Sequence, residues 1–310
     1  MLLERARPVS NAVVQGGSMK NHIIESLFET QAIRVCDPDH PFWYTSGTLG
    51  PFYINTHFLY RSELDATELL LMIEEGAESD RLYFPHFLLE NLKKMYASSE
   101  TFKYVTDLIV EEAKTIEFDF ISGGERRDFF FSILPAYLLK KPHLSIFKDM
   151  QAVYTNDDFS ETVPVYEASI QGKKALHIAD LVTEASSYIR AWIPVIEEFG
   201  GVIKDTIAVV DRKQGAEEIL QSAGVQLHSL AQIDMHLFDA AASSGDLTQD
   251  QLALVRSFID HPKEFMTSFL QMHPHYIEEQ IALGGKAKER AEVAISKGFA
   301  PAPGCSMQTE

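Results

Sequence analysis

Short apolar segments alternate with segments of helical periodicity between Phe118 and Leu230, and this alternation restricts the fold more than any other feature of the chain. Strands that alternate with helices of this length predict an α/β fold. We expect a mostly parallel twisted sheet, right-handed crossovers and helices on both faces. Ligands of such sheets bind at the carboxyl ends of the strands. The loops that begin at Ser122, Asp180 and Asp211 are therefore the first places to look for a site.

The segments around this alternation suggest how the chain is divided. Residues 1–20 are predicted to be a flexible leader, and residues 21–235 a single α/β domain with a helical insertion near 63–99. Residues 236–299 read as a helical C-terminal extension, and 300–310 as a disordered tail. Within the extension, Thr248 and Gln251 match a capping box, and 278–296 is predicted to be one helix.

Composition narrows the class of protein. Of the 310 residues, 45% are hydrophobic and 23% are charged, as in ordinary globular proteins. Lys and Arg number 27 against 45 Asp and Glu, so the formal charge is 27 − 45 = −18. A surface this acidic disfavours nucleic acid as a partner. The two cysteines, Cys36 and Cys305, form no Cys-x-x-Cys pair, and no apolar run approaches the ~18 residues of a membrane span. We therefore expect a cytoplasmic protein that binds neither nucleic acid nor membrane.

The first candidate site is the run Ser122-Gly123-Gly124-Glu125-Arg126-Arg127 between a predicted strand and helix. Gly123 and Gly124 would let the backbone approach an anion, and the start of a helix offers free N–H groups. Arg126 and Arg127 could add charge-assisted bonds to phosphate. The alternative is a tight turn with two surface arginines.

The second candidate follows the strand that ends at Asp180. An acid there could bind sugar hydroxyls or a metal-bound water. Thr183, Ser186 and Ser187 could donate hydrogen bonds to a phosphate. The alternative is a cluster of helix-capping residues, which is the commoner use of Ser and Thr. His177, within the strand itself, reads as a core histidine.

The third candidate is Asp211-Arg212-Lys213 at the end of the next strand. Arg212 could grip a carboxylate through two parallel hydrogen bonds. A solvated, charged turn is the alternative.

From about Phe42 to Leu230, the order and spacing of these segments resemble the orotate phosphoribosyltransferase family, a type I phosphoribosyltransferase. The resemblance adds the segment 45–55, which is similar to the family's Lys-Ser-Gly stretch followed by Ser-Pro-aromatic. It implies that Tyr53 covers the orotate ring and that Arg212 grips the orotate carboxylate. Thr45 stands where the family has a lysine that contacts the pyrophosphate.

The resemblance also assigns a donor side, where this sequence departs from the family pattern. It implies that Lys148 lies on a catalytic loop, that the Ser122–Arg127 loop and Lys148 hold pyrophosphate, and that Asp180 holds the ribose hydroxyls. Magnesium would arrive with the donor and be reached through Asp180. The departures here are Thr45 and Gln151 in place of lysines, Ala179 in place of the first acid of the ribose-phosphate signature, Ala185 in place of its glycine, and an intruding Glu184.

Two functions follow from the resemblance. One is transfer of the 5-phosphoribosyl group from phosphoribosyl pyrophosphate to orotate or a related base. The other is a catalytically degenerate module that binds a base or nucleotide. The chain has neither a Gly-x-Gly-x-x-Gly nor a Gly-x-x-x-x-Gly-Lys pattern, which disfavours an unrelated nucleotide binder. A homodimer is implied by the resemblance alone.

Overall fold

A computed structural model describes residues 16–301; the side chains of residues 16–21 and of residue 263 are not described. The strands are β1 (Ile33–Val35), β2 (Phe42–Trp43), β3 (Leu49–Gly50), β4 (Phe52–Ile54), β5 (Phe120–Gly124), β6 (His143–Ile146), β7 (Ala152–Thr155), β8 (Thr162–Pro164), β9 (Lys174–Val182), β10 (Val202–Asp211) and β11 (Gln226–Gln232). The helices are α1 (Gly16–Glu29), α2 (Glu63–Ser79), α3 (Phe84–Ser98), α4 (Glu100–Ala113), α5 (Phe129–Leu138), α6 (Ile193–Glu198), α7 (Ala216–Ser222), α8 (Met235–Ser244), α9 (Gln249–Asp260), α10 (Pro262–Met272), α11 (Tyr276–Leu283) and α12 (Gly285–Ser296), with the short helices η1 (Thr56–Tyr60), η2 (Val165–Glu167) and η3 (Tyr188–Trp192).

The central sheet has seven strands in the order β11-β10-β9-β5-β6-β7-β8. The five strands from β11 to β6 run parallel, which confirms the predicted mostly parallel sheet. The last two strands, β7 and β8, are antiparallel to their neighbours. This edge was not predicted, because β8 is only three residues long and none of its side chains is buried. The tips of β5, β9 and β10 are adjacent, as the alternation predicted.

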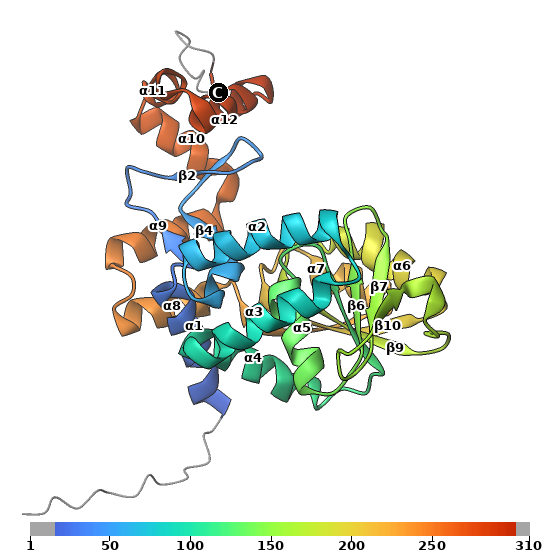
Figure 1. The fold of residues 1–310 in the computed structure, drawn as a ribbon. Helices are drawn as coiled ribbons and strands as arrows, with labels where there is room; N and C mark the ends of the chain where they lie inside the picture. The colour runs from blue at the N-terminus through green and yellow to red at the C-terminus, as the bar shows by residue number, and fades with distance from the viewer. Residues whose placement is uncertain (1–15, 302–310) are drawn as a thin grey trace, which may run out of the picture.

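Helices cover both faces of the sheet because its strands alternate their apolar side chains between two cores. Leu176 and Ile178 of β9 belong to the core that includes α1 to α5, whereas Ala175 and Ala179 belong to the core under α6 and α7. The helices predicted within residues 63–116 are α2, α3 and α4. These three helices pack together with α5 in the first core. The helices α2 and α3 therefore lie beside the sheet domain (Figure 1).

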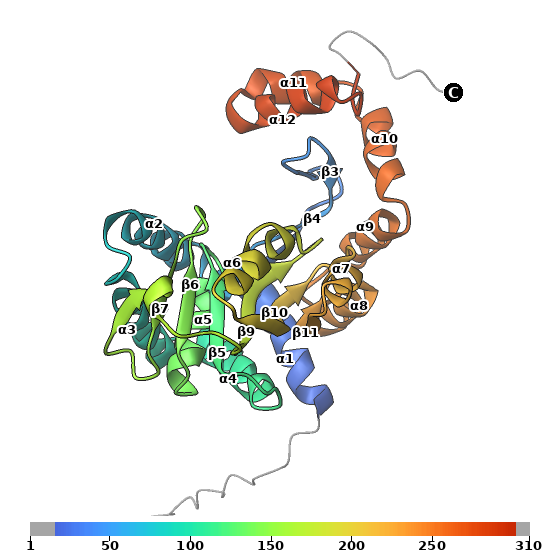
Figure 2. The ribbon, with the colours of Figure 1, turned by 90° about the vertical axis from the view of Figure 1, so that its right-hand side faces the viewer.

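The C-terminal helices extend away from the sheet. From α8 and α9 the chain leads through α10 to α11 and α12, which lie over the small β2–β3 hairpin (Figures 1 and 2). A third core joins Trp43 and Leu49 of this hairpin to Phe265, Met266 and Phe269 of α10. The hairpin that carries Thr45, where the family resemblance expects a pyrophosphate-binding lysine, therefore packs against the extension.

Two helix predictions in the extension have different outcomes. The capping box at Thr248 and Gln251 is present at the start of α9. The single helix predicted for 278–296 is wrong, because α11 ends before Gly284, whose φ of +73° breaks the helical path, and α12 begins at Gly285. The helix α1 begins at Gly16, inside the predicted leader; residues 1–15 and 302–310 lie outside the described part. Within residues 16–301, no helix is both long and apolar enough to cross a membrane.

Candidate functional site

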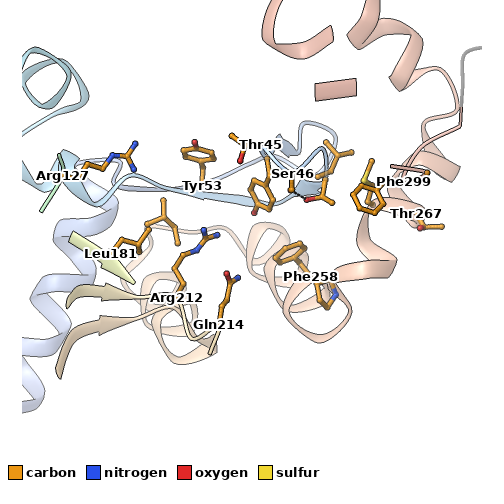
Figure 3. A pocket seen from close by; sticks show the side chains of 17 residues that line it. Thr45, Ser46, Tyr53, Arg127, Leu181, Arg212, Gln214, Phe258, Thr267 and Phe299 are labelled. Atoms are coloured by element: carbon orange, nitrogen blue, oxygen red, sulfur yellow. Dashed lines mark hydrogen bonds between the residues drawn. The ribbon is translucent and has the colours of Figure 1, made fainter. Parts of the chain in front are cut away.

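A cavity of about 840 Å³ lies between the carboxyl edge of the sheet and the C-terminal helices (Figure 3). Three groups of residues line it. The sheet domain contributes Arg127, Leu181, Arg212 and Gln214; the hairpin and β4 contribute Tyr44, Thr45, Ser46, Thr48, Leu49, Tyr53 and Ile54; the extension contributes Phe258, Pro262, Met266, Thr267, Gly298 and Phe299. Of the residues predicted to bind substrate, the structure brings Tyr53, Arg127 and Arg212 together here.

Arg212 reaches this cavity because of where β10 ends. Its backbone N–H donates to the carbonyl of Val182 at 3.0 Å, which continues the β9–β10 pairing by one residue. Asp211, just before it, is buried and accepts from the backbone of Lys213 at 2.8 Å. The Lys213 ammonium contacts Glu217 at 2.9 Å. In this turn the Asp211 side chain is buried and Lys213 pairs with Glu217. Arg212 is therefore the residue of the turn that lines the cavity.

Two guanidinium groups in the cavity form no ion pair with the described residues, although the charge of Arg127 acts on Asp180 by lowering the pKa of that carboxyl. Neither Arg127 nor Arg212 makes a side-chain hydrogen bond or ion pair with any residue in the range 16–301. Both are half-buried. A half-buried guanidinium without a partner can donate hydrogen bonds to a carboxylate or phosphate oxygen.

Aromatic side chains form the wall next to these cations. The Tyr44 hydroxyl donates to the carbonyl of Phe52 at 2.7 Å, and burial raises the pKa of Tyr44 far above its usual range, so the hydroxyl stays protonated. Tyr53 is half-buried, with its ring 6.2 Å from that of Phe42. Figure 3 shows Tyr53 between Arg127 and Thr45, where its ring can lie against a flat ligand.

A second, smaller pocket of about 350 Å³ adjoins the first and shares Arg127 and Leu181 with it. It contains the second candidate motif and the arginines of the first. Its polar lining consists of Glu125, Arg126, Arg127, Asp128, Asp180, Thr183, Glu184, Ser186 and Ser187. The predicted phosphate-side residues, other than the two glycines and Lys148, therefore do lie together.

A pair of carboxyl groups forms the floor of this smaller pocket. Asp128 accepts from the backbone N–H groups of Gly124 and Asp180, both at 3.1 Å. Asp180 is buried, and its Oδ2 has no hydrogen-bond partner. Burial, together with the neighbouring Asp128 charge, raises the pKa of Asp180. This carboxyl thus has one buried oxygen without a hydrogen bond and is less acidic than an ordinary aspartate.

His177 supports this floor from below. It is fully buried, its Nδ1 lies 2.9 Å from the Ser122 hydroxyl, and its Nε2 lies 3.4 Å from Asp128 without hydrogen-bond geometry. Its ring stacks on Trp192 with the planes 22° apart. The expectation of a core histidine fits this position, since no solvent reaches the ring.

Most cations on the phosphate side are already paired. Lys148 contacts the carboxylate of Glu125 at 3.1 Å, and Glu125 also accepts from the Lys148 backbone at 3.1 Å. Arg126 forms an ion pair with Glu74 of α2. Lys148 lines neither cavity, so the structure does not bring this predicted catalytic residue to the site.

The glycines Gly123 and Gly124 are buried strand residues that line neither cavity. A Cβ at Gly123 would lie 2.1 Å from the Ser132 hydroxyl, and one at Gly124 would lie 2.1 Å from the Trp192 ring. Close side-chain packing therefore accounts for both glycines without an approaching anion.

The turn from Thr183 to Ser187 has an unusual backbone at Ala185, where φ is +49°. A left-handed conformation favours glycine. Alanine adopts this conformation less readily than the glycine that the resemblance expects at this position.

Among the described residues, no group of three or more His, Cys, Asp and Glu side chains could hold a metal ion. Sequence reasoning missed Tyr44, Asp128 and every cavity residue of the extension. Only Asp128, next to Arg127 at the predicted start of a helix, carried a signal.

Comparisons with known proteins agree with this fold. Over 175 residues the chain is 25% identical to the orotate phosphoribosyltransferase of Sulfolobus acidocaldarius, covering 56% of this chain and 83% of that protein. Over 190 residues it is 27% identical to the orotate phosphoribosyltransferase of Pyrococcus furiosus, covering 58% of this chain and 98% of that one. No family model matches the chain.

A solved structure, that of Leishmania donovani UMP synthase, superimposes with a TM-score of 0.52 at 16% identity. The match covers 78% of this chain and 42% of that longer one, and it shows a shared fold. The curated relatives and the structural neighbour together bear out the resemblance to orotate phosphoribosyltransferases.

Proposed function

We propose that this orotate phosphoribosyltransferase-like chain binds a carboxylated pyrimidine of the orotate class in the large cavity. The observation that carries the proposal is the pair of unpartnered guanidinium groups, Arg127 and Arg212, in one cavity with Tyr53. Arg212 binds the carboxylate and Tyr53 covers the ring. A charge-assisted hydrogen bond contributes about 1.5–3 kcal/mol, so Arg212 is expected to dominate the affinity.

We propose further that phosphoribosyl transfer at this site is weak. The lining of the smaller pocket carries four acids and two arginines, and Arg126 already pairs with Glu74. Glu184 lies exposed in the turn where the resemblance expects the 5′-phosphate. Such a pocket repels a highly charged diphosphate donor.

An active transferase is the second candidate, and one observation favours it. The unpartnered Oδ2 of Asp180 belongs to the smaller pocket, which adjoins the acceptor cavity through Arg127 and Leu181. A ribose held at Asp180 would place its C1 toward the base. A ring nitrogen of the base, with its proton already lost to solvent, would form the new bond to C1 as the bond to the diphosphate oxygen breaks and the diphosphate leaves.

Calorimetry with orotate and uracil tests the binding proposal, because the two ligands share the pyrimidine ring and differ in the carboxylate. We expect orotate to bind at least tenfold more tightly than uracil. Equal affinity for the two, or no binding of orotate, would refute the proposed role of Arg212.

Radiolabelled orotate with phosphoribosyl pyrophosphate and magnesium separates the two candidates. We expect orotate binding with nucleotide formation far slower than the median enzyme turnover of about 10 s⁻¹. Turnover near that value would establish the active transferase and end the proposal of a weakened donor site.

A further inference from the structure

The large cavity has more room than a single pyrimidine needs. Pockets for drug-sized ligands have volumes of about 300–1,000 Å³ and bury most of the ligand surface. The cavity here, at about 840 Å³, lies in the upper part of that range. A one-ring carboxylate held at Arg212 and Tyr53 would leave much of it unfilled.

The unfilled part is also chemically different from the cation end. Figure 3 shows Arg127, Tyr53 and Arg212 toward one end, and Phe258, Thr267 and Phe299 toward the other. Pro262 and Met266 complete this second group. We call the end formed by Phe258, Pro262, Met266 and Phe299 the apolar end.

The apolar end packs against the β2–β3 hairpin and the β1–β4 pair. Phe258 packs edge-to-face on Phe52 with ring centroids 5.6 Å apart, and on Tyr44 at 6.4 Å. The Gln251 amide donates to the carbonyl of Val35 at 3.1 Å, and the Lys297 ammonium to that of Ser46 at 3.1 Å. Contacts at both ends of the extension keep this wall in place over the cavity.

From these observations, and resting on the proposed function, we infer that the natural ligand is larger than orotate: a planar ring carboxylate with an apolar substituent. The carboxylate is bound by Arg212, and the ring lies on Tyr53. The substituent extends to the apolar end. Burying apolar surface there adds affinity in proportion to the area removed from water.

The test compares orotate with 5-phenethylorotate, which carries a phenyl group on a two-carbon linker, by calorimetry on the full chain. We expect the substituted ligand to bind about 10- to 100-fold more tightly, the gain for burying a few CH₂-sized groups. The variant Met266→Ala should reduce that preference about threefold to tenfold, because the buried Met266 side chain lines the cavity.

Met272→Ala is the matched control, since this second methionine of α10 is 71% exposed and lies outside the cavity. Phe299→Ala, at a position 42% exposed, provides a second test if Met266→Ala does not fold. Equal affinity for the two ligands in the wild-type chain, or loss of the preference in Met272→Ala as well, would overturn the inference. Orotate binding would then still support the proposed function, whereas loss of binding for both ligands would overturn both.

Discussion

The large cavity and the loops around the smaller pocket differ in how their cations are paired. Arg212 in the large cavity and Arg127, which lines both pockets, form no hydrogen bond or ion pair within the described chain. On the phosphate side, Lys148 pairs with Glu125 and Arg126 with Glu74. The difference shows that a basic residue in a family position is available to a ligand only when no neighbouring carboxylate binds it first.

The acids reinforce the contrast. Asp128, Asp180 and Glu184 line the smaller pocket, whereas the lining of the large cavity includes no acid. The pairing of the cations and the placement of the acids both favour anion binding in the large cavity over the smaller pocket. The comparison therefore predicts strong anion binding in the large cavity and weak anion binding in the smaller pocket.

The largest expected effect is at Arg212, in the large cavity, where anion binding is predicted to be strong. Arg212→Gln keeps a polar side chain but removes the charge, so orotate affinity should fall about 10- to 100-fold. Calorimetry measures it, with Arg256→Gln as control, because Arg256 lies on the surface and pairs with Asp239. An unchanged orotate affinity in Arg212→Gln would contradict the predicted difference in anion binding between the two pockets.

Asp180 should show the next largest effect, in stability rather than in binding. A carboxyl whose pKa is raised in the folded state stabilises the fold fully below its unfolded pKa of about 4, and that contribution is lost as pH rises through the higher folded value. Asp180→Asn cannot ionise. The free energy of unfolding of Asp180→Asn, relative to that of wild type, should therefore rise by about 1–3 kcal/mol between pH 4 and pH 8.

Urea denaturation at pH 4, 6 and 8, followed by tryptophan fluorescence, measures this gain. The exposed Asp157→Asn variant is the control and should show no such trend. A pH-independent difference between Asp180→Asn and wild type would mean that Asp180 ionises normally, and the smaller pocket would then be more acidic than described here.

A smaller effect is expected at Glu184, which lines the smaller pocket, where anion binding is predicted to be weak. Glu184→Gln removes an exposed negative charge from the pocket, so affinity for inorganic pyrophosphate should rise about threefold to tenfold at low salt. Glu198→Gln, an exposed change on α6, should leave the affinity unaltered. A lower affinity in Glu184→Gln would show that repulsion at this turn does not limit anion binding.

The smallest effect is expected at Ala185. Glycine adopts its left-handed backbone without the penalty that a Cβ brings, so Ala185→Gly should be neutral or stabilising by up to about 1 kcal/mol. The same change at Ala253, an exposed position inside α9, should destabilise by about 1 kcal/mol. Denaturant titration of both variants checks the difference in sign.

The sheet could be predicted because the residues that mark each strand and its end lie close together in the sequence. Each strand from β5 to β11 in the parallel part ends in a polar or glycine-containing turn, and the alternation with helices predicts that these strands run parallel in one sheet. The position of Arg212 followed from that order. The antiparallel β7–β8 edge could not be predicted, because β8 has only three residues, none of them buried, and leaves no apolar pattern.

The apolar end of the cavity was beyond prediction for a different reason. Contacts such as that between Tyr44 and Phe258 join residues more than two hundred positions apart, and no local pattern encodes them. The role of Lys148 depended likewise on its partner, Glu125, which reading a motif does not reveal.

The Lys297 contact to the Ser46 carbonyl and the Gln251 contact to Val35 tie the two walls of the cavity together across the whole sequence. By thermodynamic linkage, a ligand that touches both walls must favour their association as much as their association favours the ligand. Ligand occupancy should therefore slow amide hydrogen exchange in α9 and α10, far along the chain from the arginine that holds the ligand's charge.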